Sequence, residues 1–345
     1  THALIQKSIK FKSLALVIVD EQHRFGVQQR ADLVAHGQTE HAFLPHFLSM
    51  SATPIPRTLS LTLFGDLDIS IINELPKGRG SILTKAVTPE NRTKAYTFAR
   101  EQIKKGRQAF VICPRIEMGD GKWEMGTEES REKIKKNILA SRFSSLASQV
   151  EVKAVKAEFE KLSKEIFPDL KIGMLHGKLK TKEKEQVMLE FKEGMIDILV
   201  STSVVEVGVD VPNATVMIIE GAERFGLSQL YQFRGRIGRG EHLSFCLLFA
   251  ESSGESSRER LNALLSAKNG FELAELDLKL RGPGEFLGGK QTGLPDTAMR
   301  ALSDMELVKE SRAAAEKILI HDPELAGAPL LLEKLKSFQK SVHLE

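Results

Sequence analysis

The chain has 345 residues, which at about 150 residues per domain predicts roughly two domains and leaves room for an appendage. Its formal charge of +3, from 49 basic and 46 acidic residues, is too balanced for a protein that holds nucleic acid by bulk charge alone. Two distant cysteines, Cys113 and Cys246, argue against a disulfide scaffold and a zinc site, and no apolar run reaches the ~18 residues of a membrane span. These features favour a cytoplasmic protein that does not enter a membrane.

Two short apolar runs come first along the chain. Leu14–Val19 predicts a strand buried on both faces, and Phe47–Ser51 predicts a second strand. A Gly/Pro-rich passage at Leu75–Gly80 then predicts a boundary, so that residues 1–78 form a first domain. Because the chain begins at Thr1, in what reads as the middle of a domain, we expect an N-terminal portion to precede it.

Residues 79–250 alternate short apolar runs with longer helical patterns, which predicts a doubly wound α/β domain with a parallel sheet. The polar stretch at about 118–150 interrupts this pattern as an insertion. Over residues 251–345 the strand pattern fades, and we expect a helical C-terminal appendage. The predicted strands are Gln108–Cys113, Lys171–Leu175, Asp197–Ser201, Thr215–Glu220 and Ser244–Ala250, and the predicted helices are Glu90–Lys105, Lys182–Glu193, Ser256–Lys268, Asp296–Ile318 and Leu330–Val342.

An acidic pair, Asp20 and Glu21, follows the first predicted strand at the carboxyl edge of its sheet, where open α/β folds bind their ligands. One carboxylate there can hold Mg²⁺ on nucleotide phosphates while its neighbour orients and deprotonates the attacking water. Gln22 and His23 would then sense the γ-phosphate. A bare Asp-Glu pair is more often an acidic strand end that caps a helix, so the apolar run before it is an essential part of the signal.

Small hydroxyl residues follow two further predicted strands. Ser51 and Thr53 lie in a turn stiffened by prolines, and such a turn can relay a change at a phosphate site to another surface. Residues 198–210 form a strand with a polar end, whose hydroxyls and backbone N–H groups suit phosphate oxygens of either DNA or a nucleotide. A strand with a merely polar terminus is an equal alternative for this second stretch. Its candidate residues are Ser201, Thr202, Gly208 and Asp210.

Gln229–Arg239 is the strongest pattern, because Arg234, Arg236 and Arg239 alternate there with glycines. The planar, permanently charged fork of arginine suits bidentate contact with phosphate, and glycines let a backbone approach closely. An arginine finger of this kind stabilises the charge that develops on a transferred phosphoryl group. The plain alternative is a basic helix end in solvent.

The chain contains no phosphate loop. Gly284–Lys290 has the G-x-x-x-x-G-K spacing, but Gln291 follows it in place of the Ser or Thr whose hydroxyl binds Mg²⁺, and no clear strand precedes it. We therefore expect half of the nucleotide site to lie in the preceding N-terminal portion, and the chain alone to be inactive as an ATP hydrolase. A DNA-binding remnant without motor activity is the alternative for the chain as it stands.

Taken in order, the acidic, hydroxyl and arginine patterns resemble motifs II, III, V and VI of the superfamily 2 helicases and translocases. The residues around them resemble the RecG family of bacterial branched-DNA helicases more narrowly, over nearly the whole chain. The matching segments are Asp20–Gly26, Ser51–Thr58, Glu223–Arg239 and Leu280–Gly288 with Gln291. The resemblance implies an α/β fold with two RecA-like parallel-sheet lobes, the first incomplete, followed by a helical hairpin that carries a translocation motif.

The resemblance also implies a role for each residue of the nucleotide site. Asp20 would hold Mg²⁺ and Glu21 would position the hydrolytic water, with ATP as the cofactor. Arg236 and Arg239 would reach across the cleft to the γ-phosphate, and Gln232 would contact the same nucleotide edge. Closure of the two lobes on ATP would then be converted into steps along DNA.

A second group of residues is implied in DNA contact and coupling. Ser201 and Thr202 would meet the DNA backbone, Gly208 and Asp210 would link that contact to the ATP site, and His176 would be a further backbone contact. The hairpin over residues 256–291 would transmit the steps. Its matching polar positions are Arg260, Arg281 and Gln291.

The activity that the resemblance implies is that of an ATP-dependent 3′→5′ DNA helicase, driving replication-fork regression and Holliday-junction branch migration in recombination and repair. Its partners would be branched double-stranded DNA and, as a candidate, single-stranded DNA-binding protein, with the enzyme acting as a monomer. The alternative is a double-stranded DNA translocase of the transcription-repair coupling type, whose helical appendage would dock an RNA polymerase-type partner. Asp-Glu-Gln-His at residues 20–23 together with Arg-Gly-Pro-Gly at 281–284 favours the RecG family.

Overall fold

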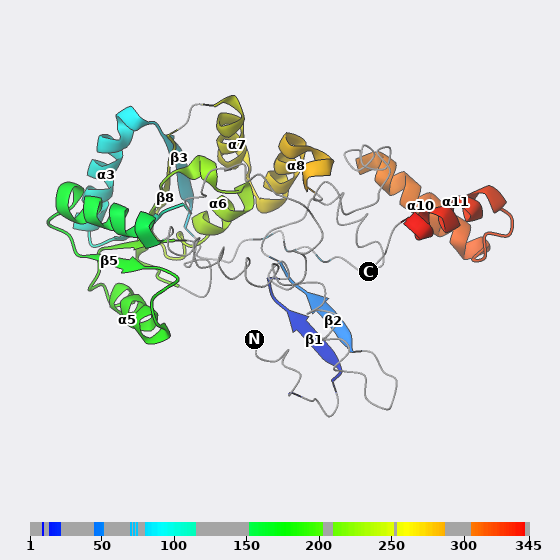
Figure 1. The fold of residues 1–345 in the computed structure, drawn as a ribbon, viewed down its shortest axis with the longest axis horizontal. Coiled ribbons are helices and arrows are strands. Elements are labelled where there is room, and N and C mark those ends of the chain that lie inside the picture. Colours follow the sequence, from blue (N-terminus) through cyan, green and yellow to red (C-terminus); the bar gives the residue numbers. More distant parts are fainter. Residues whose placement is uncertain are drawn as a thin grey trace, which may run out of the picture. The chain divides into compact units, whose positions relative to one another are not determined.

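The computed structural model describes residues 9, 14–21, 45–51, 70, 72, 74, 80–114, 152–202, 210–251, 254–286 and 305–341 (Figure 1). The chain divides into two compact units. One of them, residues 67–269 with 279–282, holds a six-stranded sheet and its helices, and the other holds the first two strands and the C-terminal helices. The domain limits expected at residues 78 and 250 stay predictions.

The six-stranded sheet is parallel at every paired edge, with strand order β3-β8-β7-β4-β6-β5. Central strands β4, β6 and β7 are buried along their whole length, as expected for apolar runs that helices cover on both faces. In a parallel sheet the carboxyl ends of all strands meet at one edge, and this edge positions the candidate site. The strands are β3 (Ile82–Val87), β4 (Gln108–Ile112), β5 (Ile172–Leu175), β6 (Ile198–Ser201), β7 (Ala214–Ile219) and β8 (Ser244–Phe249).

Helices cover both faces of this sheet. On one face α3 (Arg92–Lys104) packs its buried Ala95, Ala99 and Ile103 into a core that alternate strand residues complete. The helix over residues 152–161, which runs into the π-helical turn η4 (Leu162–Ile166), covers the same face. On the other face the Phe110 ring of β4 meets the Phe191 ring of α5 (Thr181–Lys192), with centroids 4.9 Å apart.

Two further helices of this unit follow the last strands. Helix α6 (Leu227–Arg234) lies on the side of β3 and β8 away from α3 (Figure 1), and it buries Leu227, Leu230 and Phe233. Helix α7 (Glu255–Ser266) buries Leu261, Ala263 and Leu264. Two short 3₁₀ turns, η3 (Pro89–Asn91) and η6 (Ala222–Arg224), precede α3 and α6. The parallel sheet with its helices confirms the predicted α/β class for this lobe.

The first two strands, β1 (Leu16–Val19) and β2 (His46–Ser49), pair in parallel. The expected burial of the first strand on both faces is wrong for the described residues. Val17 and Val19 are buried against Leu14 and Phe47, whereas Leu16 and Ile18 are 52% and 57% exposed. The reason is that packing among these residues forms on one side of the strand pair only.

The remaining helices are α8 (Gly270–Phe286), α10 (Met305–His321) and α11 (Pro329–Ser341). The predicted insertion at 118–150 lies outside the described residues, as does the start of the helix predicted from Asp296. Among the residues that the structure covers, no helix is both long and apolar enough to cross a bilayer.

Candidate functional site

The two candidate acids stand directly after β1. Asp20 is exposed, and its Oδ1 accepts a hydrogen bond of 2.9 Å from the backbone N–H of Glu21. Glu21 has a positive φ of 53°, a conformation that residues other than glycine seldom adopt and that occurs at functional sites more often than elsewhere. Gln22 and His23 lie outside the described residues.

The donor chemistry at this strand end fits Mg²⁺. This ion is commonly held through one or two carboxylates, with nucleotide phosphates and water completing its six ligands. Asp20 supplies such a carboxylate at an exposed strand end. The described part of the chain offers no cluster of three His, Cys, Asp or Glu side chains that would hold a metal ion by itself.

Hydroxyl residues end two of the strands. Ser51 is exposed after β2, and Thr53 lies outside the described residues. At the end of β6, Ser201 and Thr202 are fully buried, and the Ser201 hydroxyl donates a 2.7 Å hydrogen bond to the Thr202 carbonyl. The Thr202 hydroxyl has no hydrogen-bond partner among the described residues, and Gly208 lies outside them.

His176 follows β5 at the same edge of the sheet. It is 6% exposed, and its Nδ1 has no hydrogen-bond partner within the described ranges. Burial lowers the pKa of this imidazole, and the positive charges of Lys156, Lys184 and Lys178 lower it further. Lys184 also donates a 2.9 Å hydrogen bond to the Gly177 carbonyl. The carboxyl end of β5 is therefore a region of positive potential around a neutral histidine.

The three arginines after β7 have different surroundings. Arg234, on α6, donates to the Leu264 carbonyl of α7 at 3.3 Å and lies 4.8 Å from the centre of the Tyr231 ring, so it holds two helices together. Arg239 is an exposed residue whose side chain is 33% exposed, and its Nη1 is 3.7 Å from Oδ1 of Asp210. The structure thus brings together two of the predicted site residues, Asp210 and Arg239. Gln232 and Arg236 are half-buried in the same segment.

Gly238 fixes the path of the chain between Arg236 and Arg239. Its φ is +73°, and a Cβ on it would lie 2.7 Å from Cγ1 of Ile82 in β3. Glycine is therefore required here because the backbone packs closely against Ile82 of β3. The Gly/Arg alternation suggests a different reason, close approach of the backbone to a phosphate. The turn that presents Arg239 is set by the sheet beneath it.

Arginines from the predicted hairpin reach the chain just before α6. Arg260, on α7, donates to the carbonyls of Phe225 and Glu223. An Nη atom of Arg281 lies 3.7 Å from the point that a Cβ on Gly226 would occupy. Gln291 lies outside the described residues. We call Gln229–Arg239 the arginine segment. Two of the three predicted coupling residues thus lie beside the residues that lead into it.

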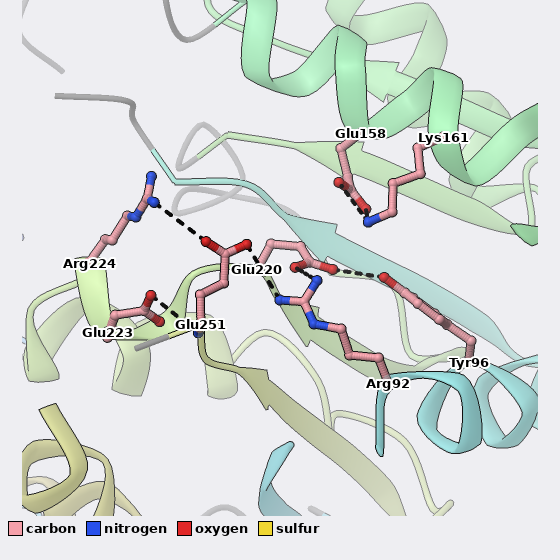
Figure 2. Close-up of polar contacts among 8 residues, drawn as sticks. All are labelled: Arg92, Tyr96, Glu158, Lys161, Glu220, Glu223, Arg224 and Glu251. Carbon is pink, nitrogen blue, oxygen red and sulfur yellow. Dashed lines mark hydrogen bonds and ion pairs between the residues drawn. The ribbon is translucent and has the colours of Figure 1, made fainter. Parts of the chain in front are cut away.

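A polar network at the carboxyl edge was missed by the sequence analysis (Figure 2). Glu220, directly after β7, accepts a 3.0 Å hydrogen bond from the Tyr96 hydroxyl and pairs with Arg92 at 3.3 Å. Arg92 also reaches Glu251, after β8, at 3.7 Å. The pattern that identified Asp20, an acid directly after a buried strand, applies equally to Glu220. A cation at the start of a helix, as Arg92 is in α3, opposes the helix dipole and signals a tertiary partner.

Burial governs the protonation of this network. It raises the pKa of Glu220, and the nearby negative charge of Glu158 adds to that effect, while Arg92 and Tyr96 counteract it. Burial likewise raises the pKa of the Tyr96 hydroxyl and of the Cys113 thiol at the end of β4. The Arg92 charge is therefore what favours an ionised Glu220 in a poorly solvated position.

Comparison with known proteins gives consistent matches. The profile of the helicase conserved C-terminal domain matches residues 93–241, and that of the ATP-dependent DNA helicase RecG, domain 3, C-terminal, matches residues 267–343. The RecG helicase of Synechocystis sp. is 48% identical over 97% of this chain and 36% of its own length. That of Thermotoga maritima is 43% identical over 96% of this chain and 39% of its own length.

A solved structure, that of RecG bound to a three-way DNA junction, aligns with a TM-score of 0.60 at 41% identity. The match covers 89% of this chain and 35% of that one. The chain therefore spans less than half the length of these relatives.

Proposed function

Because the chain belongs to the RecG family of ATP-dependent DNA helicases and corresponds to the C-terminal portion of its members, we propose that it supplies the second motor lobe and the coupling hairpin of a branched-DNA remodelling enzyme. The proposed reaction is ATP-driven 3′→5′ movement on DNA that regresses replication forks and migrates Holliday junctions. The observation that carries the proposal is the Asp210–Arg239 pair on a turn that Gly238 imposes, within the segment that carries the family's arginine pattern.

In the proposed nucleotide site the two acids and the arginines serve one ATP. Asp20 would hold Mg²⁺, which neutralises phosphate charge when bound, and Glu21 would orient the attacking water and accept its proton. Arg236 and Arg239 would stabilise the charge that develops on the γ-phosphoryl group, with Gln232 at the same edge. In support, the 3.7 Å Arg239–Asp210 pair is long and part-exposed, so a triphosphate can replace it at small energetic cost.

DNA is proposed to contact the carboxyl edge of the six-stranded sheet. The positive potential around His176 suits a phosphodiester backbone, and Lys156, Lys178 and Lys184 supply it. Ser201 and Thr202 would take part through their backbone and hydroxyl groups. The buried Thr202 hydroxyl, without a hydrogen-bond partner in the described ranges, supports a role in binding.

The hairpin is proposed to couple this edge to ATP hydrolysis. Support comes from Arg260, which binds two carbonyls directly before α6, and from the position of Arg281 beside Gly226. A movement of α7 would therefore shift the segment that leads to Arg236 and Arg239. The shared name of the relatives favours RecG-type remodelling over the transcription-repair coupling type.

The test is DNA-stimulated ATP hydrolysis by the full-length protein with Glu21→Gln, measured on a three-way junction. We expect hydrolysis to fall to background while ATP binding is retained, because the amide cannot accept the proton of water. Arg312→Ala, in an exposed ion pair on α10, is the matched control and should behave as wild type. The 345-residue chain alone should show near-background turnover. A Glu21→Gln enzyme that hydrolyses ATP at the wild-type rate would refute the proposed site.

A further inference from the structure

The connection between β7 and α6, residues 220–226, decides where the arginine segment begins. It carries the chain from the carboxyl edge of the sheet, beside α3, to α6 on the other side (Figure 1). Gly221 makes the first turn with a φ of +55°, against Pro114 at the end of β4. Whatever fixes this β7–α6 connection also fixes the start of α6 and the residues that follow it.

On the α3 side the connection is held by side chains. Both carboxylate oxygens of Glu220 are engaged, one by the Tyr96 hydroxyl at 3.0 Å and the other by Arg92 at 3.3 Å (Figure 2). The Arg92 side chain is 19% exposed and the Glu220 side chain 10%, so water competes little for this pair. The Arg92 guanidinium also lies 5.2 Å from the centre of the Phe249 ring, which restricts where it can point.

Glu251 extends this anchorage to the middle of the connection. Its carboxylate lies between Arg92, at 3.7 Å, and Arg224, at 3.6 Å. Its backbone N–H donates to the Glu223 carboxylate at 3.3 Å. Figure 2 shows these groups as one chain of contacts from α3 across the end of β8 to the turn η6. Side chains from α3 thus act on the connection at two points.

On the opposite side the same connection is bound by Arg260 of α7, through the carbonyls of Glu223 and Phe225. The seven residues of the connection are therefore held by two arginines from other elements, Arg92 of α3 and Arg260 of α7. Arg92 acts through the buried carboxylate of Glu220 and the exposed carboxylate of Glu251, and Arg260 acts through backbone carbonyls. Both arginines contact the segment that joins β7 to α6. The contacts therefore restrict the position of that segment as well as burying a charge pair.

We propose that Arg92 is a positioning residue for the arginine finger: by holding Glu220 it fixes the β7–α6 connection from which Arg236 and Arg239 are presented. The inference rests on the proposed function, since it needs the finger to act in ATP hydrolysis. Misplacing a catalytic group by about 1 Å can cost on the order of 10²-fold in rate. Loss of the Arg92 anchor should therefore lower kcat while leaving KM for ATP nearly unchanged.

Arg100 provides a matched control on the same helix. It pairs with Asp169 and lies 5.2 Å from the centre of the Phe167 ring, so it repeats the ion pair and ring contact of Arg92. Asp169, however, is not part of the β7–α6 connection. If Arg92 acts only on stability, Arg92→Gln and Arg100→Gln should lower kcat equally.

The experiment measures steady-state ATP hydrolysis on a three-way junction by variants of the full-length protein. The variants are Arg92→Gln, Arg100→Gln, Arg236→Ala, Arg239→Ala and the double change Arg92→Gln with Arg236→Ala. We expect Arg92→Gln to lower kcat by about 10-fold or more and KM to change by less than about twofold, with Arg100→Gln near wild type. The double variant should be slowed by less than the product of the two single effects, because the anchor loses part of its effect once one of the two groups that it positions is gone.

The outcomes separate this inference from the function on which it rests. If Arg236→Ala and Arg239→Ala are both as active as wild type, the finger itself is wrong. If Arg236→Ala is inactive but Arg92→Gln matches Arg100→Gln, or if the two losses multiply in the double variant, Arg92 is not a positioning residue. Should Arg92→Gln fail to fold, Glu220→Gln removes the charge that Arg92 holds and keeps an amide oxygen that can accept the Tyr96 hydrogen bond. A normal kcat in that variant would also overturn the proposal.

Discussion

Two groups of arginines in the same lobe differ in how tightly the protein holds them. Arg92 and Arg260 are part-buried and bind partners on the β7–α6 connection, whereas Arg239 is exposed and faces Asp210 across 3.7 Å. A buried, well-partnered arginine is costly to displace, while an exposed pair contributes little to stability. The first group therefore shapes the backbone, and the second is suited to exchanging its partner for a ligand.

Arg234 shows that closeness in sequence to Arg236 and Arg239 does not make an arginine available to a ligand. It stands two residues before Arg236, within the same Gly/Arg pattern, yet it binds the Leu264 carbonyl and the Tyr231 ring. The pattern of three arginines thus combines one that joins helices with two that are proposed to meet phosphate. Substitutions at these positions should separate the two kinds of effect.

The largest expected effect is on ATP turnover. Arg236→Ala or Arg239→Ala in the full-length protein should lower DNA-stimulated hydrolysis on the order of 10³-fold, because a finger stabilises charge only in the transition state. Arg234→Ala should instead lower the melting temperature, because it removes a contact between α6 and α7. Its ATP turnover should stay higher than that of Arg236→Ala or Arg239→Ala. ATPase rates and thermal melts of the three variants check this. Equal rates in all three would remove the distinction between the groups.

The next effect concerns the turn that presents Arg239. Gly238→Ala should destabilise the lobe by about 3 kcal/mol, from left-handed backbone strain of ~1–2 kcal/mol and crowding against Ile82. Gly194→Ala is the matched control, because Gly194 has a similar φ of +77° with no atom within 4 Å of the added Cβ. Chemical denaturation of both variants should therefore show a clearly smaller loss at Gly194. Equal losses would mean that packing on β3 does not set the turn.

The smallest effect is a pH dependence at the edge of the sheet that we propose to contact DNA. Because the folded-state pKa of His176 is lowered from the ordinary 6.5, its contribution to stability is full above that value and is lost as the pH falls through the lowered pKa. His176→Gln should flatten the fall in the urea midpoint between about pH 7.5 and about pH 5.5. If wild type and variant lose stability in parallel over that range, protonation of His176 does not contribute.

Sequence patterns predicted the buried strands, because burial makes their sequences almost continuously apolar. Strands β4 to β8 fall where continuous apolar runs were identified, and α5, α7 and α11 fall within two residues of their expected limits. Strand β3 was missed because it is an edge strand that contains Lys85 and follows a Gly/Pro-rich passage. The helix over residues 152–161 was missed because its charged residues continue the polar stretch before it.

The candidate site could be predicted only where chemistry and spacing are local. Asp20–Glu21 and the Gly/Arg segment are short patterns with a direct chemical meaning. The anchors of the β7–α6 connection are not local, since Arg92 and Glu220 are separated by most of the lobe's sequence and meet only because β3 and β7 end at the same edge of the sheet. Their function follows from tertiary contacts, which one sequence does not reveal.

In the proposed mechanism, acids from one lobe and arginines from the other act on the same ATP. A structure of the full-length protein with ADP and aluminium fluoride, which mimics the transferred phosphoryl group, tests it directly. We expect the guanidinium of Arg236 or Arg239 to lie within ~3 Å of a fluoride, and the Glu21 carboxylate to lie within hydrogen-bond distance of the attacking water. A complex in which both guanidinium groups stay out of hydrogen-bond reach of the fluoride would contradict it.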